Sequence, residues 1–206
     1  MFTGIITAIG TIEIAEKRED LRVKVSCPWD PATIDIGASI CCSGVCLTVV
    51  ERGGSAGDAW FAVDVSDETI RCTAKDQWVT GRTLNLEPAL KLGDELGGHL
   101  VTGHVDAVGE VAATEDVGGS TRLDIRAPAE VAPYLAAKGS VTVQGVSLTV
   151  NEVEDHDNGD CTFSLNIIPH TGEVTTLGVL APGDTVNLEI DVLARYLKRM
   201  QDLQRV

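Results

Sequence analysis

Imidazole, thiol and hydroxyl side chains at three separated positions are the residues of this sequence best suited to chemistry. His104 is the best candidate for a general acid–base, because an unperturbed imidazole titrates at about 6.5. Cys46 and Ser147 each fill the third position of a Gly-Val-x-Leu-Thr-Val segment. The thiol could add to an electrophilic ring or only line a pocket, since its thiolate fraction at neutral pH is small unless its pKa is lowered. His104 and Ser147 could form a hydroxyl–imidazole pair, but a hydrolase would also need an Asp and a strained nucleophile elbow.

The segments that carry these residues occur twice, at a spacing of about 100 residues. Three stretches return in the same order: residues 44–49 as 145–150, residues 3–10 as 102–109, and residues 83–87 as 185–189. That spacing is too long for a solenoid repeat and close to the usual size of a domain. The chain is therefore two similar domains in tandem.

The polar residues differ between the copies, while Thr48 and Thr149 recur in both. The second copy carries His104, Ser147, His170 and Lys138 where the first carries Ile5, Cys46, Glu68 and Gly37. Two similar pockets with unlike polar groups could hold similar ligands in different roles. Neutral drift between duplicated domains is the alternative explanation.

Motifs for nucleotides and metals are missing from the sequence. It contains no G-x-S-x-G, no G-x-x-x-x-G-K-[ST], and no G-x-G-x-x-G with its strand and acidic follower. His99 and His104 are a weak metal pattern, because no third ligand is nearby. The six Cys lack C-x2-C spacing, which favours reduced thiols that pack as small apolar side chains.

The charge and hydropathy of the chain limit its partners. A formal net charge of -15 with scattered Lys and Arg argues against nucleic-acid binding. No stretch approaches 18 uncharged apolar residues, and the N-terminus lacks the basic and apolar regions of a signal peptide. We therefore expect a cytoplasmic protein with neither nucleic acid nor membrane as a partner.

Short segments that alternate apolar and polar residues must position these side chains. Residues 61–65 and 163–167 are a matched pair of strands across the repeat, and turn signals recur at short intervals. About six antiparallel strands in each copy predict an all-β protein of two closed β-barrels, because closure removes exposed strand edges. Short helical turns are expected around residues 69–74 and 130–138.

The copies are expected to divide at Gly97-Gly98, which gives domains of residues 1–98 and 99–190 and a last segment of residues 191–206. Residues 191–204 read as a helix, with an apolar stripe at Leu193, Tyr196, Met200 and Leu203. The stripe could lie against its own barrel or drive self-association, since two heptads do not establish a coiled coil.

Several of these motifs resemble those of the riboflavin synthase family. They are the opening Met-Phe-Thr-Gly-Ile-Ile at 1–6, Gly-Val-Cys-Leu-Thr at 44–48, Gly-Gly-His-Leu-Val-Thr-Gly-His-Val at 97–105, Gly-Val-Ser-Leu-Thr at 145–149, and Ile-Pro-His-Thr at 168–171 followed by Thr-Thr-Leu-Gly at 175–178. They occur in the family's order, and the resemblance covers essentially the whole chain.

The resemblance implies two six-stranded Greek-key barrels and a homotrimer formed through the C-terminal helices. It implies a transferase that moves a four-carbon unit between two molecules of 6,7-dimethyl-8-ribityllumazine, in the last step of riboflavin biosynthesis. The products are riboflavin and 5-amino-6-ribitylamino-pyrimidinedione. The family uses neither a metal nor an organic cofactor, and association with lumazine synthase is a further expectation. Its working site lies between the first barrel of one subunit and the second barrel of a neighbour.

The family's ligand contacts fall on both copies of this sequence. In the first copy they are Gly4, Ile5, Ile6, Cys46, Leu47, Thr48, Asp64, Val65, Ser66, Asp67, Glu68 and Thr69. In the second copy they are Gly103, His104, Val105, Lys138, Ser147, Leu148, Thr149, Ile167, Ile168, Pro169, His170, Thr171 and Gly172. Among them, His104, Ser147, Thr149 and Cys46 are the expected catalytic residues.

Two other readings share this fold. A non-catalytic lumazine- or flavin-carrying antenna protein is the alternative, but such relatives tend to lose part of the paired signatures that survive here. The flavin-binding barrel of a ferredoxin-reductase-like oxidoreductase would require a following nucleotide domain.

Overall fold

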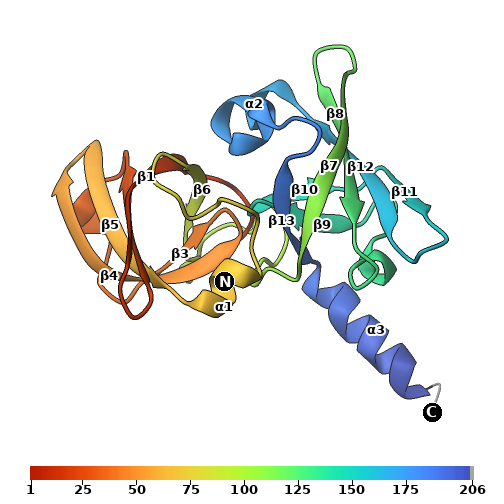
Figure 1. Ribbon diagram of the computed structural model, residues 1–206, viewed down its shortest axis with the longest axis horizontal. Helices are drawn as coiled ribbons and strands as arrows, with labels where there is room; N and C mark the ends of the chain where they lie inside the picture. The colour runs from red at the N-terminus through yellow and green to blue at the C-terminus, as the bar shows by residue number, and fades with distance from the viewer. Residues whose placement is uncertain (205–206) are drawn as a thin grey trace.

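A computed structural model describes residues 1–204, and its thirteen strands follow the two copies of the repeat (Figure 1). The first copy lies on one side and the second on the other, with helix α3 projecting from the second copy. Within residues 1–204, no helix is both long and apolar enough to cross a membrane.

The first copy folds into a closed antiparallel barrel of six strands, hereafter barrel 1, in the order β1-β2-β5-β4-β3-β6. The inward positions of the alternating segments build its core, as Val23 and Val25 of one strand do with Phe61 and Val63 of the next. The strands are β1 (Ala8–Lys17), β2 (Leu21–Cys27), β3 (Ser39–Cys42), β4 (Val45–Ser55), β5 (Asp58–Val65) and β6 (Thr83–Pro88).

The second copy has seven strands instead of the expected six, in a curled sheet with the order β10-β9-β13-β7-β8-β12-β11, hereafter sheet 2. The strands are β7 (Ala107–Asp116), β8 (Thr121–Ala127), β9 (Ser140–Val143), β10 (Val146–Thr149), β11 (Glu152–Asp155), β12 (Cys161–Ile167) and β13 (Thr185–Ile190). The extra strand arises because the counterpart of β4 is interrupted at Val150 and Asn151. β4 itself has a register shift between Val49 and Glu51, so both copies are irregular at the same place.

The matched strand pair expected from the repeat is confirmed. Phe61 of β5 and Phe163 of β12 are both fully buried, each in the core of its own copy. Short helical segments link the strands: η1 (Pro31–Thr33), α1 (Asp67–Arg71), η2 (Ala132–Tyr134), α2 (Pro169–Val174) and η3 (Thr176–Val179). The two expected helical turns correspond to α1 and η2.

Reciprocal hydrogen bonds of two buried asparagines join the copies. Nδ2 of Asn187 donates to the carbonyl of Ser43 at 2.8 Å, and Nδ2 of Asn85 donates to the carbonyl of Gln144 at 2.9 Å. Both asparagines are at most 1% exposed, so losing either bond would leave a buried carbonyl without this donor. The reciprocal bonds therefore hold the two copies against each other.

Helix α3 (Val192–Gln204) confirms the expected C-terminal helix. Oδ1 of Asp191 accepts from the N–H of Leu193 at its first turn, and Arg195 pairs with Asp106 of sheet 2 at 2.7 Å. The predicted stripe of Leu193, Tyr196, Met200 and Leu203 is exposed, together with Leu197. Within this chain the helix therefore does not bury its stripe against its own sheet. Residues 205–206 of the predicted last segment lie outside the described residues.

Candidate functional site

The segments that open the two copies, residues 3–6 and 102–105, each pack against the opposite copy. Ile6, which precedes β1 of barrel 1, packs against the core of sheet 2. Val105, which precedes β7 of sheet 2, packs against the core of barrel 1. The opening loops are therefore exchanged between the copies.

Hydrogen bonds fix each exchanged loop to a Gly-Val-x-Leu-Thr strand. The carbonyl of Gly103 accepts from the N–H of Cys46 at 2.8 Å, and the carbonyl of Gly4 accepts from the N–H of Ser147 at 2.9 Å. Both glycines have a positive φ, +75° at Gly4 and +77° at Gly103. A Cβ at either position would come within 3.0 Å of the strand it contacts, so these close approaches require glycine.

A buried glutamate of the same copy holds each loop from behind. Oε1 of Glu87 accepts from the N–H and hydroxyl of Thr3, both at 2.7 Å, and its Oε2 accepts from the N–H of Gly4 at 2.9 Å. Burial raises the pKa of the Glu87 carboxyl, while these hydrogen bonds oppose the shift.

Glu189 repeats this arrangement in the second copy. Its Oε1 accepts from the N–H of Thr102 at 2.6 Å and from its hydroxyl at 2.7 Å. Its Oε2 accepts from the N–H groups of Gly103 at 2.9 Å and His104 at 3.2 Å. Burial likewise raises the pKa of the Glu189 carboxyl. The sequence contained a signal for both residues, because each closes the repeated segment 83–87 or 185–189.

The sequence indicates only a weak metal pattern for His99. In the structure, His99 is the hydrogen-bond partner of Ser147. Its Nδ1 lies 2.7 Å from Oγ of Ser147, and its Nε2 lies 3.1 Å from Oγ1 of Thr142. Burial lowers the pKa of His99, and the nearby charge of Asp191 opposes the shift. The imidazole on Ser147 is therefore that of His99, whereas the sequence had left open a pair of Ser147 with His104.

The exchange of the opening loops explains why His104 does not lie beside Ser147. Because Gly103 is bound to Cys46, the neighbouring His104 borders barrel 1, and its side chain is exposed. The two histidines thus lie beside different strands. His104 follows the glycine that is bound to Cys46, and His99 is hydrogen-bonded to Ser147. Within residues 1–204, no three His, Cys, Asp or Glu side chains gather as a metal site.

The predicted contacts of the first copy lie where β4 separates from β5, a gap hereafter called fork 1. β4 pairs with β3 up to Thr48 and with β5 from Val49 onward. Cys46 and Thr48 direct their backbone N–H and C=O groups away from β3, as alternation in an antiparallel pair requires. The N–H of Cys46 is already bound to Gly103, so fork 1 offers the carbonyl of Cys46 and the N–H and carbonyl of Thr48, facing the end of β5 and α1.

The other side of fork 1 is formed by residues 64–69, whose polar side chains have partners within the same copy. Asp64 forms a salt bridge with Arg22 at 2.6 Å, and Asp67 forms one with Lys17 at 2.5 Å. Ser66 caps α1 by accepting from the N–H of Thr69 at 3.1 Å. Of the remaining predicted contacts, Glu68 pairs with Arg71, Val65 is buried in the barrel core, and Leu47 faces the same core.

The corresponding gap in the second copy, fork 2, lies between β10 and the end of β12. Leu148 packs partly against the core, and Thr149 is exposed. Ile167 is buried, whereas Ile168, Pro169 and His170 are exposed where α2 begins. Thr171 and Gly172 lie half-buried within α2. The N–H of Lys138 donates to the carbonyl of Val150 at 2.7 Å, which places the Lys138 loop beside the end of β10.

Because the opening loops are exchanged, the predicted contacts of one copy are divided between the two forks. Fork 1 combines Cys46 and Thr48 with the segment 103–105 of the second copy. Fork 2 combines Ser147 and Thr149 with the segment 4–6 of the first. Each fork therefore has its own imidazole, and each contains residues from both copies.

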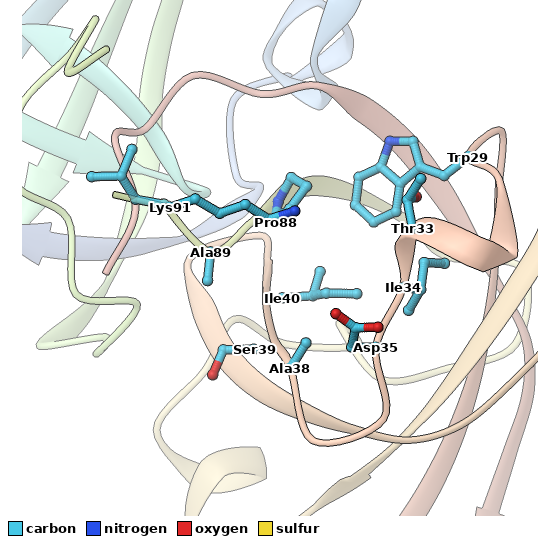
Figure 2. A pocket seen from close by; sticks show the side chains of 11 residues that line it. Trp29, Thr33, Ile34, Asp35, Ala38, Ser39, Ile40, Pro88, Ala89 and Lys91 are labelled. Atoms are coloured by element: carbon cyan, nitrogen blue, oxygen red, sulfur yellow. The ribbon is translucent and has the colours of Figure 1, made fainter. Parts of the chain in front are cut away.

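One hollow on barrel 1 lies away from fork 1. It has a volume of about 320 Å³, and its lining includes Trp29, Ile34, Ile40 and Pro88, with Lys91 at its edge (Figure 2). It contains none of the predicted contacts. A wider groove of about 510 Å³ includes Ile5 and Glu87 but no residue of the Gly-Val-x-Leu-Thr strands. Neither of these two hollows is lined by residues 46–48 or 147–149.

Comparisons with known proteins agree with this architecture. The family model described as "Lumazine binding domain" matches residues 3–89 and 102–191, one match for each copy. Among curated relatives, riboflavin synthase of Brucella abortus (strain 2308) is 48% identical and covers 100% of both chains. Riboflavin synthase of Photobacterium phosphoreum is 44% identical over 97% of this chain and 88% of its own.

Solved structures show the same fold at lower identity. The crystal structure of LumP complexed with riboflavin has a TM-score of 0.75 and 24% identity, and the match covers 92% of this chain and 99% of that one. LumP complexed with 6,7-dimethyl-8-(1'-D-ribityl) lumazine gives a TM-score of 0.72 at 23% identity over the same shares. Because the duplicated family model and relatives of 44–48% identity span nearly the whole chain, it belongs to the riboflavin synthase family of two-copy lumazine-binding proteins.

Proposed function

We propose that this chain is a transferase that forms riboflavin from two molecules of 6,7-dimethyl-8-ribityllumazine. A four-carbon unit passes from one molecule to the other, and the second product is the ribitylaminopyrimidinedione. The observation that carries the proposal is the presence of two equivalent forks with unequal polar groups, in a chain whose full-length relatives are named riboflavin synthase. Two similar sites with different polar groups suit a reaction in which one of two identical molecules donates the four-carbon unit and the other accepts it.

Each fork has the groups needed to bind a flat, polar ring. The carbonyls of Cys46 and Ser147 and the N–H groups of Thr48 and Thr149 can pair with the imide edge of the ring. Ile5 and Leu148 offer apolar contact, while the polar side chains of segments 64–69 and 167–172 can face the ribityl chain. Close stacking of the two bound rings lowers the entropic cost of their reaction.

Proton transfer is assigned to the imidazoles. The C7 methyl group of the lumazine is a carbon acid, because its anion delocalises into the ring. His104, exposed at fork 1, is the expected general acid–base. At fork 2, Ser147 is oriented by His99, while Thr149 can orient a water or a ring carbonyl. Cys46 is the nucleophile candidate or a lining residue of fork 1.

The exposed stripe of α3 supports a homotrimer, because it leaves five large apolar side chains without cover in one chain. His104 at fork 1 and Thr149 at fork 2 are exposed in one chain, so a neighbouring copy is the natural source of the missing wall. The working site would then lie between fork 1 of one subunit and fork 2 of the next.

The remaining features of the proposal follow from family resemblance and composition. They are a cytoplasmic location, a division into residues 1–98, 99–190 and 191–206, catalysis without a metal or an organic cofactor, and association with lumazine synthase.

Mixing the purified protein with 6,7-dimethyl-8-ribityllumazine tests the proposal. Riboflavin should appear, at one molecule for every two lumazine molecules consumed, and can be followed by its fluorescence. A lumazine-carrying antenna protein would bind the compound without converting it, and that outcome would refute the proposed activity. His104→Gln should slow the reaction by about 10²-fold or more, as expected for loss of a general acid–base.

A further inference from the structure

We infer that Glu87 and Glu189 are reciprocal positioning residues, each of which aligns the reactive groups beside the opposite copy's strand. The inference rests on the proposed function for its kinetic test. Neither carboxylate borders a fork directly. Each acts through the loop that it grips.

Glu189 positions fork 1, although it lies on a strand of sheet 2. Its two oxygens accept from the backbone of Thr102, Gly103 and His104, at 2.6 to 3.2 Å. The carbonyl of Gly103 in turn accepts from the N–H of Cys46. One carboxylate thus sets both the loop that carries the His104 imidazole and the strand that carries the Cys46 thiol.

Glu87 positions fork 2 in the same manner from barrel 1. It accepts from the N–H groups of Thr3 and Gly4, and the carbonyls of these two residues accept hydrogen bonds from the second copy. The carbonyl of Gly4 accepts from the N–H of Ser147 at 2.9 Å, and the carbonyl of Thr3 accepts from the N–H of His99 at 3.2 Å. Both members of the His99–Ser147 pair are therefore held by one loop and one carboxylate.

The burial of the two glutamates indicates how much the arrangement depends on them. Glu87 is 4% exposed and Glu189 is 3% exposed, so water cannot replace a lost acceptor easily. An ionised carboxylate is an acceptor at both oxygens, which matches donors on both sides. A glutamine has the same shape but replaces one oxygen with an NH₂ group, which would face an N–H of the loop.

Glu87→Gln and Glu189→Gln test the inference, with Glu110→Gln as the matched control. Glu110 lies exposed on β7, away from both loops. We expect kcat to fall on the order of 100-fold in each of the two buried variants, because small displacements of reacting groups have such effects. KM should change less than kcat. The melting temperature should fall below that of Glu110→Gln, because a buried N–H loses its acceptor, so kcat is compared at a temperature at which every variant is folded. A purely structural role would instead reduce activity only in proportion to the unfolded fraction, and that result would overturn the inference.

Thr3→Val and Thr102→Val keep the test decisive if a glutamine variant does not fold. Each removes one hydroxyl donor to the carboxylate and keeps the side-chain shape. We expect kcat to fall about tenfold, as for loss of one hydrogen bond to a charged group. Turnover within about twofold of wild type in all folded variants would contradict the inference.

A lumazine fluorescence titration separates this inference from the proposed activity. If wild type forms no riboflavin, the proposed function fails, but ligand binding still reports on the forks. Glu87→Gln and Glu189→Gln should then each weaken binding at one class of site and spare the other. Titrations identical to wild type would overturn the positioning role independently.

Discussion

At the scale of single residues, the fold surrounds the imidazole of His99 with hydroxyl groups and partly buries it. Its two nitrogens lie beside the hydroxyls of Ser147 and Thr142, so a neutral ring can donate to one and accept from the other. Protonation would make both nitrogens donors inside a partly buried site. Burial lowers the pKa of His99, because a charged ring would lose its hydration there, and this favours the neutral ring.

The His99 environment predicts a pH dependence of stability. Because the folded state lowers the pKa of His99 below its usual value of about 6.5, folding is favoured while the ring is neutral. The contribution is complete above that pH and declines as the pH falls through 6.5, by at most about 1.4 kcal/mol per pH unit. Urea unfolding at pH 5, 6 and 7 measures it.

The matched variants are His99→Gln and His170→Gln. The raised pKa values of Glu87 and Glu189 act in the opposite direction, since a buried carboxyl loses stability as pH rises through its folded pKa. The difference between wild type and His99→Gln removes that shared background. Equal slopes for wild type and His99→Gln would be incompatible with the prediction, whereas exposed His170→Gln should retain the wild-type slope.

Strands and loops of this chain differ in how far the sequence predicts them. The alternating segments and the C-terminal helix were predicted because their periodicity is local: α3 begins one residue after the expected start. The exchange of residues 3–6 and 102–105 was not predictable, because an apolar residue such as Ile6 carries no sign of which core it joins. For the same reason, nothing local to His99 indicates a partner such as Ser147.

The exchanged loops predict an unequal pair of glycine variants. Gly103→Ala should destabilise the fold by about 2–3 kcal/mol, because it combines a positive φ with a contact of 2.7 Å between its Cβ and Cys46. Gly118→Ala has a similar φ of +70° and open space around its Cβ, so it should cost only about 1 kcal/mol. Thermal unfolding gives the comparison. Equal losses would mean that the approach of the loop to Cys46 is not tight.

The exposed stripe of α3 belongs to the scale of the whole molecule, because its apolar side chains would be covered only by another copy in the proposed trimer. Met200→Glu should dissociate the proposed trimer, since it places a charge among apolar side chains. Gln201→Glu adds the same charge to an adjacent exposed position and should leave the trimer intact. Light scattering during size-exclusion chromatography measures the mass. A wild-type monomer would exclude the trimer outright.

The exchanged loops also bear on how this chain is related to a single-copy ancestor. Two copies that trade their first segments have the connectivity of a domain-swapped dimer whose partners have been joined end to end. Cut between Pro88 and Val101, each half would lack an apolar residue in its core that only the other half supplies. A lone copy would therefore have to pair with another to complete its fold. Joining the two copies in one chain keeps that pairing in place, while their reactive groups differ.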